Sequence, residues 1–251
     1  MTKDTTVGEV TANPALKDFG RLLFPVDRSV RSDMTLEEVS SSSVYVWYSH
    51  IQQTLYLWEE GNAPAVTEYT INSGGYSDNP DFRPYLTFYP VPEGTEIKGA
   101  VLICPGGAFL FRSDGPEGVS VAQALSERGY QSFVADYRLR PYTQQEGALD
   151  LARAVRFVRA HAEEFGIDEQ DIAVMGFSAG GILAGELPPT FYCYGTEDPF
   201  YRQFLANVGA AEEAGVTVQR LQLDGMPHGF GSRGGWLEEY DRFLTDVFSG
   251  K

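Results

Sequence analysis

The pentapeptide Gly176-Phe177-Ser178-Ala179-Gly180 has the residue types and spacing of a nucleophile turn. It follows the short apolar run 172–175 and opens a stretch with helical spacing, so the serine is expected at a sharp strand-to-helix turn. Glycines at both flanks let such a turn close without side-chain collisions, and the helix N–H groups then point at the exposed hydroxyl. The pattern predicts a nucleophilic serine; the alternative is a glycine-rich turn with an ordinary capping serine.

A serine hydroxyl is a weak nucleophile near neutral pH and needs an adjacent base. The chain has three histidines. His228 follows the expected strand 216–223, and loops at the C-terminal ends of strands are where α/β folds collect catalytic groups, so His228 is predicted to be the base. His161, near the end of an amphipathic helix, is expected on the surface, and His50 is expected to be structural or on the surface.

A carboxylate is then needed to orient the imidazole and to stabilise its protonated form. Asp198 follows the expected strand 190–194 and lies between Ser178 and His228, which gives the chain order Ser, Asp, His. Its neighbour Glu197 is the rival for this role, and Asp224, beside the histidine loop, is a weaker third choice.

An oxyanion requires N–H donors that are already in place. Ala179, directly after the serine, supplies one by position. The loop 105–109, Pro-Gly-Gly-Ala-Phe, follows the apolar run 100–104, and its small residues allow a close backbone approach, so Gly107 and Ala108 are the other candidates. The alternative for this loop is a plain tight turn.

Short apolar runs alternate with amphipathic helical stretches from residue 66 onward, which is typical of an α/β sheet with right-handed crossovers. The nearly continuous apolar character of several runs suits strands covered on both faces. The expected strands are 66–71, 85–89, 100–104, 132–137, 172–175, 190–194 and 216–223, and the expected helices are 118–128, 147–165, 199–214 and 236–248.

Residues 1–62 lack this alternation and are predicted to form a mainly helical N-terminal extension to a catalytic domain at 63–251. The extension contains a helical candidate at 14–23 and a longer one that begins with Thr35 as its cap, has Glu38 three residues later, and runs to about Glu60. Its aromatic residues would suit a cover over the site or a contact in a homodimer; the alternative is a loosely packed tail. These residues are Tyr45, Trp47, Tyr48, Tyr56 and Trp58.

The charge balance, 19 Lys+Arg against 35 Asp+Glu for a net charge of −16, argues against nucleic acid and anionic membranes as partners. Neither an apolar run long enough for a membrane span nor a secretory signal is expected. Cys104 and Cys193 are expected to be buried, reduced thiols without metal-ligand spacing, which fits a cytoplasmic location. The serine chemistry needs no metal or organic cofactor.

In their order along the chain these motifs resemble the α/β-hydrolase fold, and within it the bacterial acetyl-esterase and xylan-esterase-like branch of the carbohydrate esterases. The resemblance runs from about residue 66 to 248 and rests on the loop 104–109, the turn 176–180, the segments 188–191 and 195–198, and the run 228–231. It implies a three-layer sandwich with a mostly parallel sheet, and hydrolysis of a small acyl ester, such as acetyl, on a sugar or similar alcohol.

The chain departs from the family between the nucleophile turn and Asp198. Relatives carry a full helix, a further strand and a substrate-covering segment there, whereas only residues 181–187 separate Gly180 from Pro188. One strand and the cap are therefore predicted to be missing, and whether Asp198 still reaches His228 is left open by the sequence. A degenerate, non-catalytic hydrolase acting as a binding or scaffold protein is thus the alternative to an esterase. A thiol hydrolase of the dienelactone type is disfavoured by a serine at the turn.

Overall fold

The computed structural model describes residues 53–185 and 189–250, and within the first 52 residues only 5, 6, 8, 9, 32–35 and 38. The chain divides into two compact units, Met1–Gln52 and Gln53–Lys251. The second unit begins inside the segment expected to belong to the extension, at the first residue of a strand.

In the first unit, Thr6 and Thr35 form an isolated antiparallel bridge. The capping pair predicted at Thr35 is present, because the Glu38 N–H donates to Thr35 Oγ1 (3.2 Å) and the Thr35 N–H donates to Glu38 Oε2 (2.8 Å). The expected helix at 14–23, three of the five aromatic residues of the extension and His50 lie outside the described residues.

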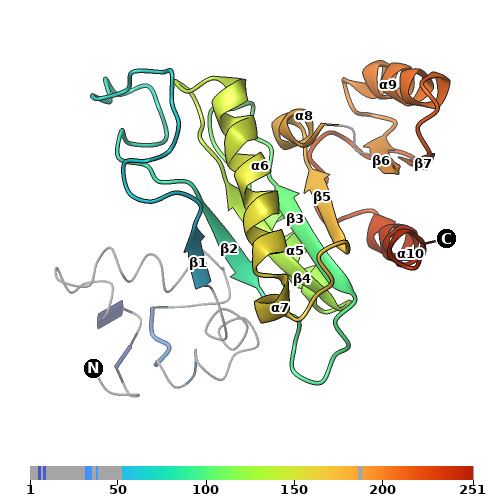
Figure 1. Cartoon of the computed structure of the whole chain (residues 1–251), viewed down its shortest axis with the longest axis horizontal. Coiled ribbons are helices and arrows are strands. Elements are labelled where there is room, and N and C mark those ends of the chain that lie inside the picture. The colour runs from blue at the N-terminus through green and yellow to red at the C-terminus, as the bar shows by residue number, and fades with distance from the viewer. Residues whose placement is uncertain are drawn as a thin grey trace. The chain divides into compact units, whose positions relative to one another are not determined.

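The second unit is built on a five-stranded sheet of order β1-β2-β4-β3-β5 (Figure 1). The pairs β1·β2 and β2·β4 are antiparallel, and β4·β3 and β3·β5 are parallel. A further parallel pair, β6·β7, forms a separate two-stranded sheet. The strands are β1 (Gln53–Tyr56), β2 (Tyr85–Tyr89), β3 (Gly99–Cys104), β4 (Tyr130–Asp136), β5 (Ile172–Gly176), β6 (Thr190–Gly195) and β7 (Val218–Leu223).

Helices cover both faces of the central strands, which gives the predicted three layers (Figure 1). Side chains alternate along β4: Phe133 faces a helical layer where it contacts Phe165, whereas Tyr130 and Val134 face the opposite layer, where Tyr130 contacts Phe248. Strands β3 and β4 are buried along their whole length, as their apolar runs predicted. The helices are the π-helix η1 (Asp114–Val119), α5 (Ser120–Ser126), α6 (Gln144–Ala160), α7 (Ala162–Phe165), α8 (Ala179–Ala184), α9 (Tyr201–Glu213) and α10 (Trp236–Phe248).

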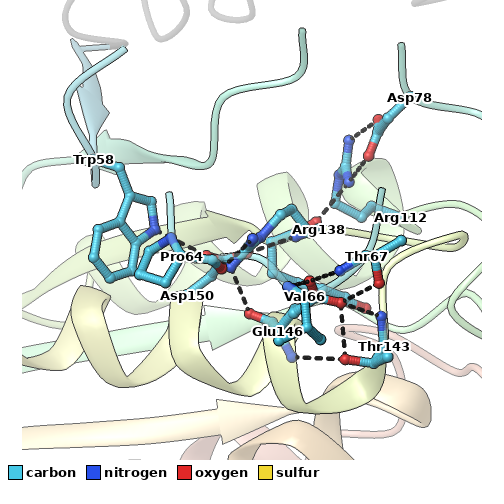
Figure 2. Close-up of polar contacts among 11 residues, drawn as sticks. Trp58, Pro64, Val66, Thr67, Asp78, Arg112, Arg138, Thr143, Glu146 and Asp150 are labelled. Carbon is cyan, nitrogen blue, oxygen red and sulfur yellow. Dashed lines mark hydrogen bonds and ion pairs between the residues drawn. The ribbon is translucent and has the colours of Figure 1, made fainter. Parts of the chain in front are cut away.

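Two secondary-structure predictions are wrong. Residues 53–56, expected at the end of a long helix, form β1, because this stretch completes the antiparallel edge beside β2. Residues 66–71, expected as a strand, form an irregular segment instead. Figure 2 shows a contact that contributes to the second error: the Val66 and Thr67 N–H groups donate to Glu146 Oε1 (2.8 and 3.0 Å) at the start of α6, so these two donors need no partner strand.

The predicted loss of a strand agrees with the sheet topology. In the described part of the chain β5 pairs with β3 alone and β6 pairs with β7 alone, so the main sheet and the two-stranded sheet are not hydrogen-bonded to each other (Figure 1). Only Gly185–Pro189 connect the end of α8 to the start of β6. Five residues are too few for a covering domain or for the crossover connection to a further parallel strand, which takes about a dozen residues or more.

The hydrogen bonds of the Glu146 carboxylate lead to a prediction about the stability of the fold. Its carboxylate, buried at the α6 N-terminus, accepts from Thr67 and Thr143 as well as Val66. Burial alone would raise the pKa of Glu146, but these hydrogen bonds lower it from 4.5 to about 2. We expect Glu146→Ala to lower the free energy of unfolding at pH 7 by about 2–3 kcal/mol in urea titrations. The exposed Glu164→Ala is the control.

The sign of the pH dependence follows from the lowered pKa. The carboxylate stabilises the fold fully above the unfolded-state pKa of about 4.5, and this contribution is lost as the pH falls toward about 2. The stability difference between wild type and Glu146→Ala should therefore shrink over that range. A difference that stays constant down to pH 2.5 would contradict the assignment.

Candidate active site

Ser178 lies at the turn between β5 and α8, and its backbone is strained, with φ 48° and ψ −117°. The flanking glycines are required by close contacts. A Cβ on Gly180 would lie 2.0 Å from the carbonyl oxygen of Cys104, and a Cβ on Gly176 would lie 2.5 Å from that of Gly180. Ser178 is exposed, so the turn presents its hydroxyl to solvent at the C-terminal end of β5.

His228 bridges Ser178 and Asp198. Its Nδ1 lies 2.8 Å from Asp198 Oδ2, and its Nε2 lies 3.0 Å from Ser178 Oγ. A carboxylate can only accept, so Nδ1 carries the proton and Nε2 is left to accept the proton of the serine hydroxyl. The structure therefore brings the three predicted residues into one hydrogen-bonded chain, and it answers the question of whether Asp198 reaches the histidine.

Asp198 is buried, and both of its carboxylate oxygens are engaged: Oδ1 accepts from the Phe200 N–H (2.8 Å) and Oδ2 from His228. The two rivals do not contact the histidine in the described structure. Glu197 is exposed, and Asp224, also exposed, accepts from the side-chain amide of Gln222.

The loops that hold Asp198 and His228 are joined to each other directly. The Glu197 N–H donates to the Met226 carbonyl (3.1 Å), and the Gly225 N–H donates to Thr196 Oγ1 (2.8 Å). A Cβ on Gly195 would lie 1.9 Å from the Met226 carbonyl oxygen, so glycine is required at the end of β6. The parallel pairing of β6 and β7 thus places the acid and the base together without the missing strand.

The loop after β3 contains the predicted oxyanion donors and is strained. Gly107 has φ 131°, and Ala108 and Phe109 have φ of 55° and 60°, a region that costs a non-glycine residue about 1–2 kcal/mol. In the described part of the chain, the N–H groups of Gly107, Ala108 and Ala179 donate to no acceptor. They are available to a developing oxyanion, and backbone strain of this kind clusters at functional sites.

Glu117 of η1 is a buried carboxylate, 5% exposed, that the sequence analysis missed. Its Oε2 accepts from the Gly106 N–H (2.8 Å), directly before the oxyanion loop. Burial raises the pKa of Glu117, whereas the Gly106 N–H and the neighbouring His228 favour its ionised form. No local sequence signal marks this residue, because η1 brings it to the site from outside the recognised motifs.

A cavity of about 300 Å³ borders the oxyanion loop, with Phe109 in its wall. The Arg140 N–H donates to the Phe109 carbonyl (3.0 Å), and this bond joins the part of the lining that contains Arg140 to the oxyanion loop. The lining is aromatic and polar: Tyr76, Phe109, Arg140, Pro141, Tyr142, Thr143 and Gln144.

Two arginines with buried side chains, Arg138 after β4 and Arg112 after β3, form ion pairs with aspartates (Figure 2). Arg138 pairs with Asp150 through two hydrogen bonds of 2.8 Å, and Arg112 pairs with Asp78 through bonds of 2.9 and 2.7 Å. Arg112 also lies 3.1 Å from Asp136, whose pKa burial raises to about 7. These pairs hold the loop between β1 and β2 and the loop after β4 in place.

The remaining candidates lie outside this cluster. His161 ends α6, with Nδ1 2.8 Å from the Phe157 carbonyl oxygen. Cys104 and Cys193 are free thiols, Cys104 fully buried and Cys193 half-buried with a pKa raised by burial to about 12. Among the described residues no cluster of three His, Cys, Asp or Glu side chains could hold a metal ion. No described helix is both long and apolar enough to cross a membrane.

A Ser-His-Asp chain at the C-terminal ends of parallel strands, with the serine on a strained strand-to-helix turn, defines the α/β-hydrolase fold. The solved structure of an acetyl ester-xyloside bifunctional hydrolase from Caldicellulosiruptor lactoaceticus shares this fold. Its TM-score is 0.64 at 22% identity, over 80% of this chain and 96% of that one.

Within this fold, the chain is similar to esterases of the acetyl- and xylan-esterase kind. The BD-FAE family model matches residues 87–199. The acetylxylan esterase of Xylanibacter ruminicola is 34% identical over 93 residues, 37% of this chain and 18% of that protein. Esterase LipC of Mycobacterium tuberculosis is 35% identical over 91 residues, 36% of this chain and 23% of that protein. The chain spans at most 27% of the length of the curated relatives it matches.

Proposed function

We propose that this chain is a serine carboxylesterase that cleaves small acyl esters, with acetyl groups on carbohydrate or similar alcohols as the favoured substrates. The observation that carries the proposal is the imidazole of His228, within hydrogen-bond distance of both Ser178 and Asp198. The similarity to esterase LipC and to an acetylxylan esterase supports ester hydrolysis as the reaction.

The reaction follows from the roles of these groups. Ser178 Oγ attacks the ester carbonyl while His228 Nε2 takes its proton, and the tetrahedral oxyanion accepts from the N–H groups of Gly107, Ala108 and Ala179. His228 then protonates the leaving alcohol, and an acyl-serine remains. Water, deprotonated by the same imidazole, attacks the acyl-serine and releases the carboxylic acid. Asp198 stabilises the imidazolium in both halves of the reaction.

Two features support a small acyl group on a sugar-like alcohol. The connection between α8 and β6 has only five residues, too few for a covering domain, and Ser178 is exposed, which favours a small acyl group. The cavity behind Phe109 offers aromatic faces and polar side chains together, a combination suited to a sugar ring.

The wild-type chain provides the first test. A fluorophosphonate probe should label it stoichiometrically, with the label mapped to Ser178 by mass spectrometry, and p-nitrophenyl acetate should be hydrolysed with saturation kinetics. Esters of longer acyl chains should be hydrolysed progressively more slowly. Absence of both labelling and turnover in the folded protein would favour the alternative, a non-catalytic scaffold built on the hydrolase fold.

The cavity gives a separate prediction about specificity. Tyr76→Ala removes one aromatic wall, and we expect it to raise KM for acetylated xylo-oligosaccharides about fivefold to tenfold, the value of one ring contact of about 1–1.5 kcal/mol. Tyr76→Phe keeps the ring and is the matched control. Hydrolysis of p-nitrophenyl acetate should change less than about twofold. Equal effects on both substrates would show that the cavity does not bind the sugar.

A further inference from the structure

The carboxylate of Glu117 beside the site is unusual because it is buried, no arginine or lysine pairs with it in the described structure, and it accepts a single hydrogen bond, from the Gly106 N–H. The other buried carboxylates have more partners. Asp136 and Asp150 each pair with an arginine, Asp198 pairs with His228, and Glu146 accepts from Val66, Thr67 and Thr143. A buried carboxylate with neither a cationic partner nor a full set of hydrogen bonds is costly, and a neighbour that carries positive charge at some stage offsets this cost.

Glu117 contacts the oxyanion loop at Gly106, where the serine turn also packs. A Cβ on Gly106 would lie 2.8 Å from Ser178 Cβ and 2.9 Å from Glu117 Oε2, so the serine and the carboxylate approach the same point from two sides. The missing side chain of Gly106 allows both approaches, and the Gly106 N–H donates to Glu117.

Glu117 also lies against the histidine loop. A Cβ on Gly229, the residue after His228, would lie 3.6 Å from Glu117 Oε1, and one on Gly231 would lie 2.6 Å from the Pro116 carbonyl oxygen. The turn that carries His228 therefore packs on η1 at Pro116 and Glu117.

We propose that Glu117 is a positioning residue of the site, which holds the oxyanion loop through Gly106 and stabilises the imidazolium of His228 as a second buried negative charge. This role rests on the proposed esterase chemistry, in which His228 gains and loses a proton in each half-reaction. Asp198 is hydrogen-bonded to the ring, whereas Glu117 acts through space from the side of the oxyanion loop.

The other groups near His228 do not supply this charge. Ser178 is neutral, and the ring of Phe200 meets the imidazole edge-to-face at 5.4 Å. Glu197 and Asp224 on the neighbouring loops are exposed, and Arg233, also exposed, donates to the Phe230 carbonyl. Exposed charges are screened by water and salt, so Glu117 and Asp198 dominate the field at the ring.

The test is the charge-removing variant Glu117→Gln, in which the side-chain carbonyl can still accept from Gly106. With only three histidines in the chain, the ring signals of His228 can be followed by NMR through a pH titration. We expect the midpoint to fall by about half to one pH unit, because the protonated ring loses a stabilising charge. The acid limb of the pH profile for p-nitrophenyl acetate hydrolysis should shift to lower pH by the same amount. We expect kcat to fall about tenfold and KM to change less than about twofold.

Two further variants make the result decisive. The exposed Glu127→Gln changes the net charge equally and should leave the midpoint and kcat unchanged. Glu117→Asp keeps the charge but shortens the reach to Gly106, so kcat should fall with the midpoint unmoved. It serves as the test even if Glu117→Gln does not fold.

An unchanged midpoint in folded Glu117→Gln, or the same shift in Glu117→Asp as in Glu117→Gln, would overturn the proposal. The NMR midpoint does not depend on turnover. An inactive wild type would therefore defeat the proposed function, whereas an active wild type with an unmoved midpoint would defeat only the role of Glu117.

Discussion

Ser178→Ala should lower kcat for p-nitrophenyl acetate by about 10⁴-fold or more and abolish fluorophosphonate labelling. The substitution removes only the oxygen that attacks the carbonyl and leaves the β5–α8 turn, whose shape depends on Gly176 and Gly180, in place. Residual hydrolysis would come from the oxyanion donors and His228 acting on water.

The control for this loss is Ser249→Ala, an exposed serine at the end of α10, which should retain full activity. A second variant, Ser178→Gly, should be equally inactive but more stable to heat, because glycine tolerates a φ of 48° that strains serine. Substantial turnover by Ser178→Ala, well above that of the buffer, would assign the reaction to another group.

Asp198→Asn should lower kcat by about 10³–10⁴-fold while KM changes little. An asparagine that keeps its oxygen on the Phe200 N–H turns its amide NH₂ toward His228 Nδ1. The ring then accepts at Nδ1 and carries its proton on Nε2, which faces Ser178 Oγ and can no longer take the serine proton. The Ser178 hydroxyl would still be hydrogen-bonded to the His228 ring, but that ring could no longer take its proton.

The matched control is Glu197→Gln, which removes a carboxylate from the adjacent, exposed position of the same loop. It should keep activity within about twofold, since surface charges contribute little. Far-UV circular dichroism and thermal unfolding should match wild type in both variants. If Glu197→Gln were the more damaging change, the acid would have to be reassigned to the rival that the sequence left open.

The sequence predicted most of the elements that carry the site. Strands β3, β5, β6 and helix α10 lie within about one residue of their expected bounds, because unbroken apolar runs and regular helical spacing are strong local signals. The errors fall where the signal is weak. Alternating residues at 66–71 resemble a strand, yet the N–H groups of Val66 and Thr67 at its start bond to Glu146, which is distant in the sequence.

By itself the sequence determined the nucleophile turn, the acid and base candidates and the shortened connection after α8, because each depends on neighbours within a few residues. The steric limit at Gly176 is of this local kind, since a Cβ there would meet Gly180 and Gly181, whereas the limit at Gly180 comes from Cys104 on β3. Only the tertiary structure decided that Asp198 reaches His228 and that Glu117 lies between the oxyanion and histidine loops. Those contacts depend on how β6, β7 and η1 pack. This packing results from many contacts between residues far apart in the sequence, and no short stretch of sequence encodes it.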